Sequence, residues 1–195
     1  MSQLDQLLAD LTSKDDPRAE AAVVQIIHYG QPAFDALTKM AQDPDPDIRW
    51  WAIRALSEFT DQDASLLFIK ALSDSDLEIQ ACAALALRLQ PNPKAIPNLV
   101  NLLGHPDQLL SRLAGNALVA LGIKSTQPLI DLVNEGNSVS QRTRLEAVRA
   151  LAEIKDPTSI STLFKIYQEG SSIMQHWAEE GLNRMGIGMV FFDPG

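Results

Sequence analysis

The sequence predicts an all-α fold, a right-handed α-solenoid built from about six short helix pairs. Two observations predict it. A short motif, alanine followed four residues later by leucine or isoleucine, recurs six times along the 195 residues, with 30 to 34 residues between successive alanines. A second amphipathic segment precedes each copy. Repeats of this length, each made of two amphipathic segments, are typical of stacked helix pairs.

The six motifs predict the inner helix of each pair. The residue three positions after the alanine is small in five of the six copies, Gln25 being the exception. A small residue there lets neighbouring helices approach closely, and the leucine or isoleucine at the fourth position fills the layer between them. The pairs are Ala22/Ile26, Ala52/Leu56, Ala83/Leu87, Ala117/Leu121, Ala147/Leu151 and Ala178/Leu182.

The preceding segments predict the outer helices, at residues 4–11, 33–41, 64–72, 95–103, 126–133 and 159–167. The connections between helices, such as "QDPDPD", "SDSD" and "GHPDQ", are rich in residues that cap or stop helices. We therefore expect one repeat domain over residues 1–186. We expect residues 187–195 to form a non-helical apolar tail, which either caps the last repeat or presents Phe191 and Phe192 as a hook for a partner.

Composition restricts the class of partner. The net charge of −9 argues against nucleic acid, because phosphate binding needs a basic face. No apolar run approaches the length that crosses a membrane. Cys82 is the only cysteine, which excludes an internal disulfide and a metal site built from several thiolates. A reducing, cytoplasmic compartment is the simplest interpretation.

Two phrases carry a resemblance to a known family. They are "DPDIRWWAIRALSEFTDQDASLLFIKAL", residues 45–72, and "SQRTRLEAVRALAEIKDPTSISTLFKIY", residues 140–167. Both resemble the short HEAT-like repeat of the phycobilisome (bilin) lyase type. The family includes subunits of E/F-type bilin lyases, phycobilisome-degradation adaptors and HEAT proteins that only bind other proteins. The resemblance thus implies a protein partner, either a phycobiliprotein or a second HEAT-repeat chain, and for the lyases a linear tetrapyrrole (bilin).

Two adjacent tryptophans focus the search for a binding surface. Neighbouring helix positions differ by about 100°, so Trp50 and Trp51 cannot both face the core. A helical projection places Trp51, like Trp177, at the flank of the core as a wedge between repeats. It places Trp50 on a ridge that we expect to line the concave face. The corresponding positions in other repeats extend this ridge into a groove, with Trp50, Arg54, Leu85, Arg88, Val119, Leu145, Arg149 and His176 as candidate binding residues.

Arginine is confined to the predicted inner helices and their first residues, which hold all nine arginines. An apolar face that carries arginine suits a partner with carboxylates and aromatic surface. Arg49 and Arg144 have an alternative role, because arginines at these positions can instead bridge to acidic residues of neighbouring repeats.

No catalytic constellation is recognisable. The sequence has no phosphate-binding loop, no paired histidines at metal-ligand spacing and no nucleophile motif. The acidic pairs at Asp43, Asp45 and Asp47 and at Asp74 and Asp76 lie in turns, where helix capping explains them. We therefore expect a non-catalytic interaction scaffold or adaptor.

The alternative that the resemblance implies is a bilin lyase subunit. In bilin attachment the nucleophilic cysteine belongs to the acceptor protein, so this chain needs no nucleophile of its own. Arg54 and Arg149 would then hold the propionates of the bilin, and Trp50 would stack on one of its rings.

Overall fold

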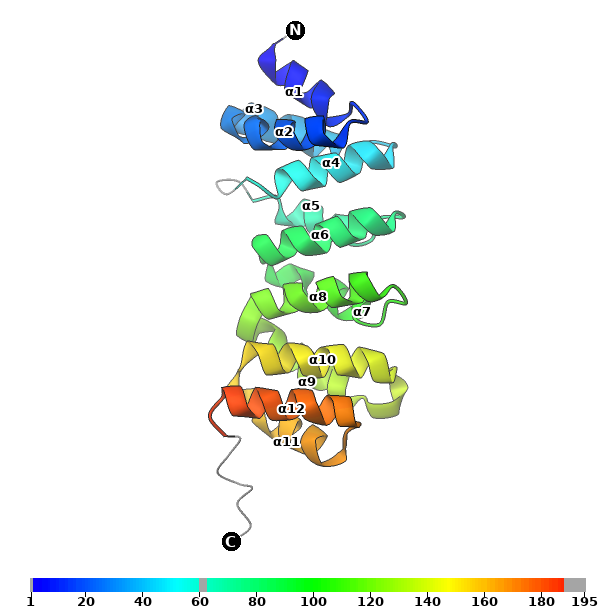
Figure 1. Ribbon diagram of the computed structural model, residues 1–195, viewed down its shortest axis with the longest axis vertical. Helices are drawn as coiled ribbons and strands as arrows, with labels where there is room; N and C mark the ends of the chain where they lie inside the picture. Colours follow the sequence, from blue (N-terminus) through cyan, green and yellow to red (C-terminus); the bar gives the residue numbers. More distant parts are fainter. Residues whose placement is uncertain (1, 60–62, 188–195) are drawn as a thin grey trace. The chain divides into compact units, whose positions relative to one another are not determined.

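The computed structural model describes residues 2–59 and 63–187, and every regular element in these ranges is a helix (Figure 1). They contain twelve α-helices, and five 3₁₀ helices in the connections at Ile27–Tyr29, Pro93–Ala95, Gly122–Ser125, Gly136–Ser138 and Pro157–Ser159. The predicted all-α repeat fold is confirmed. The tail that carries Phe191 and Phe192 lies outside the described residues.

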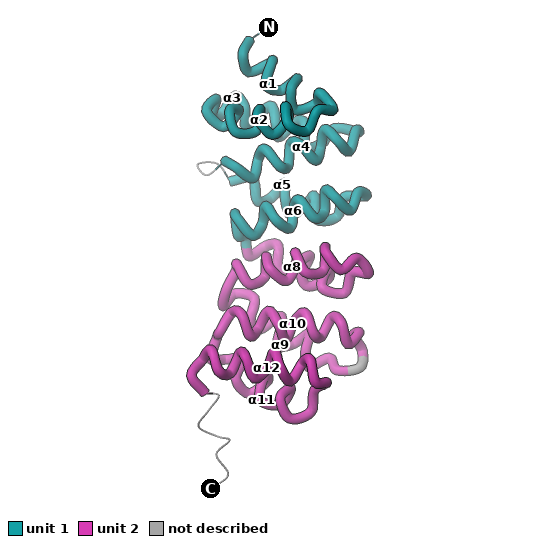
Figure 2. Tube along the Cα trace, viewed as in Figure 1, with its two compact units in different colours: residues 1–92 teal, residues 93–195 magenta. Residues whose placement is uncertain are grey.

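The chain divides into two compact units, residues 1–92 and 93–195 (Figure 2). Unit 1 contains three helix pairs in chain order: α1 (Gln3–Leu11) with α2 (Asp16–Ile26), α3 (Gln31–Met40) with α4 (Pro46–Leu56), and α5 (Ser65–Ala71) with α6 (Leu77–Leu89). Helix α4 contacts both α2 and α6, so these three inner helices form one layer.

Unit 2 repeats the arrangement with three further pairs. They are α7 (Ile96–Leu102) with α8 (Gln108–Leu121), α9 (Thr126–Asn134) with α10 (Gln141–Ile154), and α11 (Ile160–Glu169) with α12 (Ser172–Arg184). Here α10 contacts both α8 and α12. A single continuous domain over residues 1–186 stays a prediction.

The recurrent alanine motif forms the core of both units, as predicted. All six alanines are at most 1% exposed, and the leucine or isoleucine four residues later is buried in every copy. A close approach of two helix backbones occurs at Gly181 of α12, where an added Cβ would lie 2.8 Å from the Cα of Ala152 in α10. The missing side chain at this third-position residue therefore lets α12 pack closely against α10.

Acidic and hydroxyl residues begin most inner helices. The side chain of Asp45 accepts from the backbone N–H of Asp47, and that of Asp76 accepts from Glu78 and Ile79. In unit 2, Asp107 caps α8 and Ser140 caps α10. Capping is thereby confirmed for Asp45 and Asp76, because their oxygens satisfy N–H groups that have no partner within the helix.

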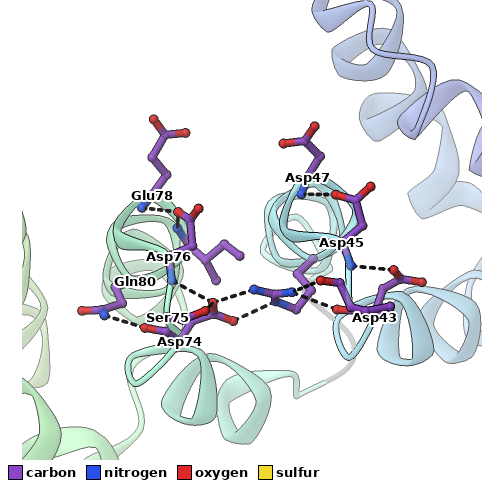
Figure 3. A network of polar contacts seen from close by, with 11 residues as sticks. Asp43, Asp45, Asp47, Asp74, Ser75, Asp76, Glu78 and Gln80 are labelled. Carbon is purple, nitrogen blue, oxygen red and sulfur yellow. Dashed lines mark hydrogen bonds and ion pairs between the residues drawn. The ribbon is translucent and has the colours of Figure 1, made fainter.

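Arg49 joins two successive turns of unit 1, whose acidic residues are labelled in Figure 3. Its Nε and Nη2 donate to the two carboxylate oxygens of Asp74 at 2.9 and 2.8 Å. Its Nη1 donates to the carbonyl oxygens of Asp43 and Pro44, both at 2.9 Å. The bridging role is thus confirmed for Arg49. Arg144, in contrast, has no ion pair among the described residues, and its Nε is buried without a hydrogen-bond partner.

This bridge makes unit 1 sensitive to acid. The hydrogen bonds from Arg49 lower the pKa of Asp74 below 3.8. A carboxyl whose pKa is lowered by folding stabilises the protein above its unfolded pKa and loses that contribution as the pH falls through the folded value. We expect Asp74→Asn to cost about 1–2 kcal/mol at neutral pH.

The measurement is the urea unfolding midpoint of the wild type and of Asp74→Asn between about pH 7 and pH 2. The gap between the two proteins should narrow as the pH drops below 3.8. A gap that stays constant down to the lowest pH would show that the charge of Asp74 is not what stabilises the turn.

Candidate functional site

The two adjacent tryptophans of α4 have different environments. Trp51 is 9% exposed, whereas Trp50 is half-buried. Their rings meet edge to face, with centroids 4.8 Å apart and planes at 85°. The predicted division between a packed and a more exposed indole is confirmed, but Trp50 is less exposed than a free ridge position because its ring rests against that of Trp51.

Trp50 lines a pocket of about 570 Å³ that lies wholly within unit 1. The turn between α1 and α2 and the first turns of α4 and α6 surround it. We call it the Trp50 pocket. Its apolar lining comes from three repeats and consists of Leu11, Pro46, Ile48, Trp50, Trp51 and Ile79.

The rim of the Trp50 pocket is strongly acidic. Lys14 is the single positive charge among the lining residues. Six carboxylates line the pocket: Asp16, Glu20, Asp45, Asp47, Asp76 and Glu78. Two of the six cap helices, and Glu20 pairs with Arg54. The other three carboxylates, Asp16, Asp47 and Glu78, have no ion pair among the described residues. This rim should therefore attract positive charge.

Figure 3 shows how two of these acids lie. The carboxylates of Asp47 and Glu78 project to the same side from the first turns of α4 and α6, away from the side chain of Asp74. Sequence reasoning assigned Asp47 to capping, but the cap of α4 is Asp45. A signal was present in the sequence: the first turns of α2, α4 and α6 contain an acid, and those of α8, α10 and α12 contain none.

Arg54 is half-buried on α4 and is held by two carboxylates. Its Nη2 lies 3.2 Å from Oε2 of Glu20, and its Nη1 bonds to Glu58, just beyond the C-terminal end of α4. The positive charge of Arg54, which the sequence analysis assigned to partner binding, is therefore largely compensated by Glu20 and Glu58.

Arg149 is a correction to the sequence prediction. It was expected on an exposed ridge, but it is only 2% exposed. Its Nε lies 3.0 Å from Oε2 of Glu146 and its Nη1 pairs with Glu153, both on α10. Its Nη2 packs against Gly115 of α8 and has no hydrogen-bond partner. Gly115 leaves the space that admits the guanidinium, and the two glutamates neutralise it.

The remaining candidates lie on inner helices of both units. On α6, Leu85 is 43% exposed and Arg88 is exposed. In unit 2, Val119 on α8 and Leu145 on α10 are half-buried, and His176 on α12 is exposed, with its ring 5.9 Å from that of Trp177. One groove through all six repeats stays a prediction.

Cys82 is a further reactive side chain, and it is buried. Burial raises the pKa of the Cys82 thiol to about 12, so the thiol is neutral at physiological pH and is not an activated nucleophile. Within residues 2–59 and 63–187, no three His, Cys, Asp or Glu side chains are placed to hold a metal ion. None of the helices described is both long and apolar enough to cross a membrane.

Comparison with known families decides the family. The model of HEAT repeats matches residues 4–67 and 65–139. The chain belongs to the HEAT-repeat family. In this HEAT-repeat protein, residues 143–163 also match the PBS lyase HEAT-like repeat. No curated protein matches it.

Solved structures share the fold of this HEAT-repeat protein. The complex of CpcE and CpcF of phycocyanin lyase from Nostoc sp. PCC7120 aligns with a TM-score of 0.57 and 22% identity, over 95% of this chain and 78% of that one. An engineered protein aligns with a TM-score of 0.58 and 21% identity, over 95% and 99%. A designed armadillo-repeat protein in complex with the peptide (KR)4 aligns with a TM-score of 0.53 and 19% identity, over 94% and 100%.

Proposed function

We propose that this HEAT-repeat protein is a non-catalytic interaction scaffold that docks a partner protein at the Trp50 pocket. The observation that carries the proposal is the half-buried indole of Trp50 in an open, acid-rimmed pocket. Aromatic side chains in concave sites are the anchors that contribute most to protein–protein binding. The first partners to test are a phycobiliprotein and a second HEAT-repeat chain, which the match to the PBS lyase HEAT-like repeat supports.

The alternative function, a bilin lyase subunit, fits the residues less well. A linear tetrapyrrole carries propionates, which need unpaired cations. Arg54 already has two carboxylate partners, and Arg149 is buried between Glu146 and Glu153. The acidic rim of the Trp50 pocket would repel a propionate. We therefore favour the scaffold over the lyase. The cytoplasmic location suggested by the single cysteine stays a prediction.

The docking proposal is tested by binding of purified phycobiliprotein, and of candidate HEAT-repeat chains, to the immobilised protein. The test variant is Trp50→Ala, and the control is Leu66→Ala on α5, whose side chain is 59% exposed and lies outside the pocket. We expect the control to bind like the wild type and Trp50→Ala to bind at least tenfold more weakly, since loss of a central aromatic anchor costs about 2 kcal/mol or more. Equal binding by all three proteins would refute docking at Trp50.

The lyase alternative is tested by adding phycocyanobilin and recording its absorbance. The scaffold proposal predicts no shift in the bilin spectrum. A red shift that Arg54→Ala abolishes would instead support tetrapyrrole binding at this residue.

A further inference from the structure

We infer that the Trp50 pocket takes an extended, cationic segment of its partner, with a lysine or arginine at every third residue. This inference rests on the proposed docking function and specifies its ligand. The occupant must satisfy three features of the pocket. They are an apolar lining that includes a half-buried indole, an excess of negative charge, and acids in the first turns of three successive inner helices that have no ion pair among the described residues.

The charge of the rim determines the sign of the ligand. Six carboxylates face one lysine, and Asp16, Asp47 and Glu78 have no ion pair among the described residues. An apolar or anionic segment laid over these groups would remove their water without replacing it, which is costly. A guanidinium or ammonium supplies the missing partner and can also lie against the Trp50 ring.

Helix formation alone does not account for these acids. An acid in the first turn favours a helix through its dipole. Yet α8, α10 and α12 form in unit 2 with no acid in the first turn, and α8 and α10 use Asp107 and Ser140 as their caps. The unpaired carboxylates belong instead to the three helices that surround or adjoin the Trp50 pocket.

The spacing of these helices selects the conformation of the ligand. Asp16, Asp47 and Glu78 each lie in the first turn of successive inner helices, α2, α4 and α6, which contact one another in order. Packed helices are about 8–10 Å apart. A polyproline II segment rises about 3.1 Å per residue with three residues per turn, so that every third side chain lies on one face about 9 Å from the next. Such a segment places one cation at each helix.

The indole favours the same kind of segment. Grooves lined by aromatic side chains bind polyproline II segments because these are already extended and lose little entropy on binding. Trp50 lies one helical turn after Asp47 on α4 and lines the same pocket. It therefore provides an apolar contact for the residues between successive cations.

The test uses three nine-residue peptides and the full-length chain, with binding followed by tryptophan fluorescence. The first peptide has the sequence Arg-Pro-Ala repeated three times. The second has the same composition with its three arginines adjacent, and the third has glutamate in place of arginine. We expect the first to bind at least fivefold more tightly than the second, with affinity falling as salt is added, and the third not to bind.

Matched variants locate the binding. Asp47→Asn with Glu78→Gln should weaken binding of the first peptide about tenfold, which is the sum expected for two solvent-accessible charge pairs. The control is Asp35→Asn with Glu135→Gln, which changes the net charge equally at two exposed positions outside the pocket. It should change the affinity less than twofold.

The outcomes separate this inference from the docking proposal. If the partner protein binds in a Trp50-dependent way while the arginine peptide fails to bind and Asp47→Asn with Glu78→Gln has no effect, the cationic ligand is wrong and the scaffold stands. Equal binding of the spaced and adjacent arginine peptides would overturn the three-residue spacing. If Trp50→Ala changes neither partner nor peptide binding, both proposals fail.

Discussion

Replacing Arg149 with methionine is expected to lower the free energy of unfolding by about 3 kcal/mol. The guanidinium is buried between Glu146 and Glu153, and Glu146 is itself only 7% exposed. Methionine fills much of the volume but leaves a buried carboxylate with one remaining partner, the half-exposed Arg112. A buried carboxylate that has lost one of its two cationic partners, rather than lost packing, is the expected cause of the instability.

A double variant separates charge from packing. Adding Glu146→Leu to Arg149→Met removes the stranded carboxylate and replaces the pair by apolar side chains of similar size, an exchange that is often neutral or stabilising. Urea unfolding should show that the double variant regains at least half of the loss. If it is less stable than Arg149→Met alone, the instability does not come from the buried charge of Glu146.

The second large effect is expected at Gly181, where alanine should lower the unfolding free energy by about 1–2 kcal/mol. Alanine gains about 1 kcal/mol over glycine from helix propensity. Overpacking costs about 1–3 kcal/mol or somewhat more. The new Cβ would meet the Cα and Cβ of Ala152 at 2.8 and 2.9 Å and Leu163 at 3.0 Å. Because one of these atoms is backbone, α10 and α12 must separate, so the packing cost outweighs the gain.

Thermal unfolding measured by circular dichroism tests this expectation. Gly181→Ala should melt several degrees below the wild type. A melting temperature equal to or above that of the wild type would mean that α12 can move away from α10 at little cost, and that the small residue is not required for close packing.

The helices and their core were predictable because their determinants are local. The alanine and the leucine or isoleucine of each motif are one helical turn apart. Capping by Asp45 and Asp76 involves residues within three positions. The arginines were predicted to lie on the inner helices from the same kind of local pattern. The structure confirms this for all nine. The residue pattern within one helix is therefore enough to predict the helix and its buried face, without the positions of the neighbouring helices.

The environment of Arg149 was not predictable in this way. A helical projection gives the direction of a side chain, but it does not give the space that a neighbouring helix leaves. Here Gly115, on α8, opens that space, and Glu146 and Glu153 compensate the charge. Burial of the arginine depends on a contact between two repeats.

The candidate site was predicted in part. The direction of the Trp50 side chain could be predicted from its angle on α4. The pocket around it depends on how three repeats pack together, which the pattern of one helix does not give. Asp47 was interpreted as a cap because it lies next to a residue that does cap, and Glu78 was not singled out. Comparison of the first turns of all six inner helices distinguishes them, since only those of unit 1 contain an acid.

The central claim is that a partner covers Trp50, and fluorine NMR of the protein labelled with 5-fluorotryptophan tests it most directly. The chain has three tryptophans, so the spectrum holds three signals, which single Trp→Phe variants assign. On addition of a bound partner, the signal of Trp50 should shift or broaden most, that of Trp51 less, and that of Trp177 in unit 2 should stay unchanged. A partner that binds while the Trp50 signal remains at its free position would contradict docking at this pocket.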